Sequence, residues 1–109
     1  MTDREILELA AKAAGVPIRD LDNRYDRWEA DPILIHRAWN PLEDDGDCAR
    51  LEAELRLTAL WMDYCVMVEV PGEFLIAEDY DLEATTDQRQ AARRFAVARA
   101  AAEIGKGMK

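Results

Sequence analysis

The sequence predicts an α+β domain in which three helices pack on a small antiparallel sheet. Apolar residues recur at helical spacing near 3–14, 45–56 and 86–104. Between the second and third of these segments, β-prone residues flank a Pro-Gly turn. The chain has 109 residues, 50% hydrophobic and 34% charged, which suits one globular domain spanning 1–109.

The first predicted helix covers about residues 3–14. Thr2 and Glu5 have capping-box spacing, so each side chain can accept a hydrogen bond from a free backbone N–H of the other residue. Gly15 suits the left-handed position after the last turn, and Pro17 prevents continuation. One apolar face is expected from Ile6, Leu9, Ala10, Ala13 and Ala14.

Residues 24–38 are aromatic and β-branched on both sides of a turn-prone Glu-Ala-Asp-Pro stretch, which predicts a hairpin. Tyr25, Trp28 and Trp39 would pack over the sheet, or else form an exposed binding hot spot. His36, the one histidine, has no second histidine or C-x-x-C nearby to share a metal. We therefore expect His36 to be structural or exposed.

A break at Asn40-Pro41 precedes the second predicted helix, about 45–56. Asp44 or Asp45 is a natural N-cap, and carboxylates in the first turn favour the helix dipole. The run does not fit an EF-hand register, so capping is preferred to calcium binding. The expected buried face is Cys48, Leu51 and Leu55, with Arg50, Glu52, Glu54 and Arg56 pointing outward.

Strands are expected at about 57–62, 65–70 and 73–78, which places hairpins across 57–78. Pro71-Gly72 has the residues of a type II turn. Alternation puts Val66, Val68 and Val70 on one half-buried face.

The last predicted helix opens at Thr85, with Gln88 at capping-box spacing, runs to about Ile104 and stops at Gly105. Its many alanines favour helix and permit close packing. One packed face is expected from Ala91, Phe95, Ala98 and Ala102, with Arg89, Arg93, Arg94 and Arg99 elsewhere.

The net charge of −9 is unevenly distributed. Residues 1–88 hold 8 Lys/Arg and 22 Asp/Glu, whereas residues 89–109 hold 6 and 1. The acidic body argues against direct nucleic-acid binding, because phosphate contacts need cations. The basic last helix would either complement this body or offer a local contact for nucleic acid.

Several features predict a cytoplasmic protein without membrane association. The chain contains no apolar run of the roughly 18 residues that a bilayer requires. Its first residues lack the basic start and apolar block of a signal peptide. Cys48 and Cys65 are far apart, which fits free thiols in a reducing compartment.

Two segments carry a resemblance. The block Trp39-Asn-Pro-Leu-Glu-Asp-Asp-Gly-Asp-Cys-Ala-Arg-Leu is similar to a Trp-Asn-Pro-Leu-x-Asp-Asp-Gly-Asp-Ala block in small, mostly uncharacterised accessory proteins of tailed phages and prophages of proteobacteria. The stretch from Ala92 to Gly105 is similar to their Ala/Arg-rich closing helix, and Glu8-Leu-Ala-Ala-Lys-Ala-Ala-Gly also fits. Cys48 departs from the alanine of that block. The resemblance implies a phage protein expressed in the host cytoplasm and carries no catalytic residues.

The expected function is non-enzymatic, because P-loop, dinucleotide, zincin and nucleophile-elbow motifs are absent. No cofactor or metal is expected. The leading hypothesis is an inhibitor or modulator of a host protein, of the anti-CRISPR or anti-restriction type, whose acidic surface steers toward basic partners. The alternative is a structural protein that self-associates, as a homodimer, through the C-terminal helix. The candidate partner-binding residues are Glu43, Asp44, Asp45, Asp47, Glu78, Asp79, Asp81 and Glu83.

Overall fold

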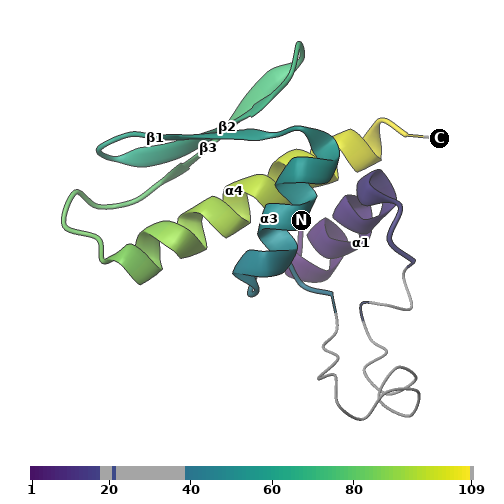
Figure 1. The fold of residues 1–109 in the computed structure, drawn as a ribbon, viewed down its shortest axis with the longest axis horizontal. Helices are drawn as coiled ribbons and strands as arrows, with labels where there is room; N and C mark the ends of the chain where they lie inside the picture. Colours follow the sequence, from purple (N-terminus) through teal and green to yellow (C-terminus); the bar gives the residue numbers. More distant parts are fainter. Residues whose placement is uncertain (18–20, 22–38, 109) are drawn as a thin grey trace, which may run out of the picture.

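The computed structural model describes residues 1–17, 21 and 39–108. Along this part the elements are α1 (Asp3–Ala14), α3 (Asp45–Leu55), β1 (Thr58–Trp61), β2 (Cys65–Val70), β3 (Phe74–Asp79) and α4 (Thr86–Lys106). Figure 1 shows their arrangement, and the predicted α+β class with three helices and an antiparallel sheet is confirmed. The hairpin predicted at 24–38, with Tyr25, Trp28 and His36, lies outside the described residues.

Helix α4 is the centre of the described structure. It contacts α1, α3, β2 and β3 (Figure 1). An alanine-rich helix can occupy this position because its short side chains let neighbours approach from several directions. None of the helices in the described ranges has the length and apolarity needed to cross a bilayer.

The burial of α4 differs from the single face expected. Ala98 and Ala102 are buried beside Ile6 of α1, as predicted, but Ala91 is exposed. A second buried face meets the sheet and α3, through Ala92, Ala96, Val97, Ala100 and Ala101. The predicted single face of Ala91, Phe95, Ala98 and Ala102 did not include these residues. A helix that is covered from both sides has no single apolar stripe.

The sheet has the order β1-β2-β3 with antiparallel neighbours. Gly72 has a φ of 73°, and Glu73 N donates to Val70 O at 3.0 Å, as the predicted Pro-Gly turn requires. The inner face is confirmed, since Val66 and Val68 are fully buried and Val70 nearly so. The observed strand ends differ from the predicted ends by at most one residue.

The capping box of α1 is confirmed in both directions between Thr2 and Glu5, and these hydrogen bonds hold the pKa of Glu5 below its usual value. Gly15 takes the expected left-handed conformation, with a φ of 75°.

The stop predicted at Gly105 is wrong. Helix α4 continues to Lys106, and Gly105 is buried where α4 crosses α1. A Cβ on Gly105 would lie 2.1 Å from the Leu9 carbonyl oxygen. This glycine therefore permits a close helix contact and does not end the helix.

Helix α3 ends one residue earlier than expected, because Arg56 adopts a left-handed φ of 57° as its C-cap. Cys48 and Leu51 are buried as predicted, and Trp39 and Leu55 pack against the same core. Burial raises the pKa of the Cys48 thiol to about 12. The prediction that Glu52 points outward is wrong, since its side chain is 19% exposed and bonded to α4.

Candidate functional site

The first acidic run, at the start of α3, serves the fold. Asp44 is the N-cap and accepts from Asp47 N at 2.8 Å. Asp47 in turn accepts from Asn40 N at 2.9 Å. Asp45 pairs with Arg94 of α4 at 2.7 Å. Three of the four candidate carboxylates here therefore have partners inside the chain, and Glu43 is the exposed exception.

The segment before α3 and the last helix contact each other. Arg94 of the last helix donates from Nε to the Leu42 carbonyl oxygen at 3.0 Å, in addition to its ion pair with Asp45. Pro41, between Asn40 and Leu42, is fully buried. The contacts of Leu42 and Asp45 with Arg94 therefore hold α3 against α4.

Two other arginines of α4 also pair with acidic neighbours. Arg93 forms a bidentate pair with Glu52, with both N–O distances 2.9 Å, and this bond raises the pKa of the guanidinium. Arg99 pairs with Glu78 of β3 at 3.2 Å. Arg93, Arg94 and Arg99 therefore complement the acidic body and do not form a free basic patch.

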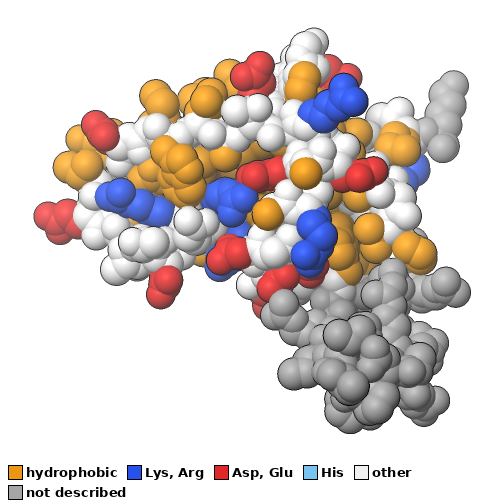
Figure 2. Space-filling view, viewed as in Figure 1, with side chains coloured by type: hydrophobic (Ala, Val, Ile, Leu, Met, Phe, Trp, Pro, Cys, Tyr) orange, Lys and Arg blue, Asp and Glu red, His pale blue; other side chains and the backbone are white. Residues whose placement is uncertain are grey.

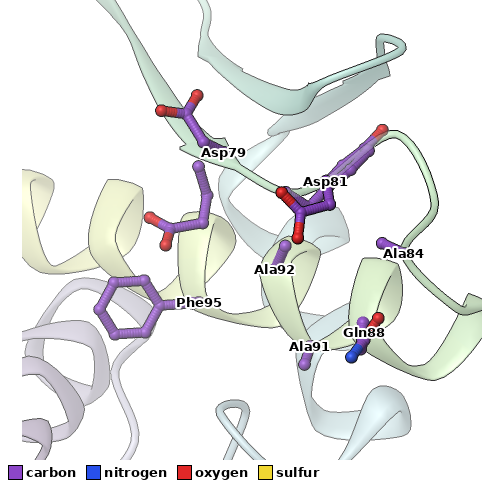
Figure 3. A pocket seen from close by; sticks show the side chains of 9 residues that line it. Asp79, Asp81, Ala84, Gln88, Ala91, Ala92 and Phe95 are labelled. Carbon is purple, nitrogen blue, oxygen red and sulfur yellow. The ribbon is translucent and has the colours of Figure 1, made fainter.

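The second acidic run borders a groove of about 380 Å3 between the end of β3 and α4. One wall is Glu78, Asp79, Tyr80 and Asp81, and the other is Gln88, Ala91, Ala92 and Phe95 of α4, with Ala84 at the end. Figure 3 shows the Asp81 carboxylate directed toward α4, the Asp79 carboxylate pointing away from it, and the Phe95 ring at the side of the groove. The groove thus has one wall that carries carboxylates and an opposite wall that is largely apolar.

The four candidate residues of this run have different environments. Glu78 is half-buried and neutralised by Arg99. Asp79, Asp81 and Glu83 are exposed and form no ion pair with any residue in the described ranges. The structure therefore leaves three carboxylates, close together along the chain, available to a partner.

Contacts with α4 and the β1–β2 turn hold the wall of the groove in place. The Arg89 guanidinium donates to the Leu82 carbonyl oxygen at 2.9 Å and lies 5.5 Å from the centre of the Tyr80 ring. The Tyr80 hydroxyl donates to the carbonyl oxygen of Met62. The acidic connector after β3 is thereby positioned by specific contacts.

The described residues contain no group of three or more His, Cys, Asp or Glu side chains placed to hold a metal ion. Among the groove residues, Gln88 and Phe95 were not expected to lie beside the acidic connector. Their sequence signal was the helical register of α4, but that register does not say which strand end the helix faces.

Comparison of the chain with protein-family models, with curated proteins and with solved structures gives no match.

Proposed function

We propose that this chain is a non-enzymatic, phage-encoded protein that binds a host protein through the acidic groove and thereby inhibits or modulates it. The partner presents lysine or arginine side chains, as nucleic-acid enzymes and defence complexes do at their phosphate-binding sites. The resemblance to phage accessory proteins supports the bacterial cytoplasm as the place of action.

The observation that carries this proposal is the contrast between the two acidic runs. In the run at 43–47, three carboxylates are bonded within the chain. In the run at 78–83, Asp79, Asp81 and Glu83 are exposed and unpaired among the described residues. Neighbouring carboxylates repel one another, so their clustering without cations weakens the folded state. A basic partner would relieve that repulsion on binding.

The alternative, self-association through the last helix, was suggested by small residues on that helix, and most of them are not available for it. Ala98 and Ala102, two of the three small residues that suggested it, are already buried against α1. A homodimer would have to use another surface.

The proposal is tested by affinity capture from a nuclease-treated host lysate with three forms of the protein. Asp81→Lys/Glu83→Lys reverses the charge beside the groove. Glu43→Lys/Glu54→Lys makes the same net change at exposed positions of the α3 side. We expect the wild type and the α3-side variant to retain one stoichiometric host protein that the groove variant loses.

The captured protein is then purified and titrated against each form. We expect its affinity for the groove variant to be at least about tenfold weaker, because two attractions become repulsions. Affinity for the wild type should fall as salt rises. Equal affinity of both variants, or an affinity insensitive to salt, would contradict the acidic-groove proposal.

A further inference from the structure

The outer face of the sheet departs from the usual pattern of an antiparallel sheet that is covered on one side. Such a sheet normally alternates between apolar residues facing its helices and polar residues facing water. Here the inner valines follow that rule, but the outer positions do not. The residues of the outer face are Thr58, Leu60, Cys65, Met67, Glu69, Leu75, Ala77 and Asp79.

The strand register places the apolar members of this face together. Leu60 lies opposite Met67, and Met67 lies opposite Ala77. Leu75 is the cross-strand partner of Glu69, next to that row. Leu60 is 42% exposed and Leu75 50% exposed.

No element in the described ranges covers this side of the sheet, which Figure 1 shows opposite α4. In Figure 2, hydrophobic side chains gather on the surface over the sheet. Contiguous exposed apolar surface of this kind marks interaction sites in soluble proteins.

The charges on this face limit its occupant. The charged residues of the outer face are Glu69 and Asp79, both exposed and both acidic. A second copy docked face to face would bring like charges together, and an anionic membrane surface would be repelled. A partner with an apolar centre and basic flanks would complement the face.

The dimensions also limit the occupant. Three strands span roughly 10 Å between the outer two, which is about the diameter of one helix. Strands β2 and β3 have 6 residues each, so the face is about 20 Å long, the length of a helix of about 14 residues.

We infer that the outer face of the sheet docks an amphipathic helix of a partner protein, with an apolar stripe and flanking lysines or arginines. Asp79 belongs both to this face and to the wall of the acidic groove, so one partner can contact both surfaces. In that respect the inference rests on the proposed function, since the helix would belong to the same host protein.

The test uses synthetic peptides of about 14 residues, which match the length of the outer face. One carries leucines on one helical face and lysines on the rest, the second replaces the lysines with glutamates, and the third is oligolysine of equal charge. Leu60→Ser/Leu75→Ser removes apolar contacts from the outer face. Met108→Ser is the control, because Met108 is 43% exposed but lies after the end of α4, away from the sheet and the acidic connector.

We expect saturable binding of the leucine–lysine peptide, weakened by about tenfold or more in the double variant and unchanged in the control. Binding of the glutamate peptide or of oligolysine with similar affinity would overturn the inference. So would a wild-type dimer in sedimentation that the double variant abolishes, since the occupant would then be a second copy. Loss of peptide binding in the double variant with no effect of Asp81→Lys/Glu83→Lys on host-protein capture would reject the acidic groove alone. The reverse result would reject the docked helix alone.

Discussion

Replacing Gly105 with alanine tests the close contact between α1 and α4, on which the helical layer depends. The added Cβ would lie 2.1 Å from the Leu9 carbonyl oxygen and 2.8 Å from the Leu9 carbonyl carbon, whereas real Cβ contacts stay above 3.0 Å. The obstructing atoms belong to the backbone of α1, so no side chain can rotate away. The helices would have to separate by about 1 Å, which is an overpacking change.

Two effects decide the size of the loss. Overpacking costs typically about 1–3 kcal/mol, and a backbone obstruction places this site at the upper end. Alanine in a helix interior recovers about 1 kcal/mol relative to glycine. We expect Gly105→Ala to lower the free energy of unfolding by about 2 kcal/mol, which corresponds to a fall in Tm of roughly 10 °C.

Urea unfolding followed by circular dichroism measures this loss, and Gly107→Ala is the matched control. Gly107 has an ordinary φ of −79°, and its Cβ would meet nothing closer than the Ile104 carbonyl oxygen at 3.6 Å. The control should be unchanged or more stable by up to about 1 kcal/mol. If Gly105→Ala is as stable as wild type while the control behaves as expected, the inference that α1 and α4 leave no room for a Cβ at Gly105 is refuted.

Three further predictions follow from single sites. Arg56→Gly should stabilise the protein by about 0.5–1 kcal/mol, because Arg56 holds a left-handed φ of 57° at the end of α3; a loss in urea unfolding would show that its side chain contributes more than this conformation costs. Glu52→Gln should cost about 1–3 kcal/mol, because it leaves the guanidinium of Arg93, whose side chain is 16% exposed, without its charged partner. Combining it with Arg93→Met should cost less than the sum of the single changes, and additive losses would show that the pair is not coupled. Burial raises the pKa of Cys48 to about 12, above the roughly 8.5 of an unfolded cysteine, so the folded state holds this proton more tightly. The resulting stability is full below about pH 8.5 and declines by at most about 1.4 kcal/mol per pH unit as the pH rises toward 12. Cys48→Ala should flatten that decline, and an unchanged slope would assign it to other groups.

The sequence by itself determined the local elements. Capping boxes at Thr2 and Thr85, the left-handed Gly15 and the Pro-Gly turn are short-range signals, because each is satisfied by atoms within a few residues. The alternation of Val66, Val68 and Val70 also fixed which face of β2 is buried before any partner was known.

Only the tertiary structure decided the roles of residues whose partners lie far along the chain. Gly105 has the local signature of a helix end, but Leu9 of α1 makes it a packing glycine inside the helix. In the sequence Glu52 resembles a solvated helix residue, but in the fold Arg93 of α4 binds its carboxylate on α3. The two acidic runs look alike in sequence, and they differ because α4 brings Arg94 to Asp45 but presents alanines and Phe95 to Asp81. Charge composition is a local property, whereas the neutralisation of a charge depends on which cation the fold places within about 4 Å.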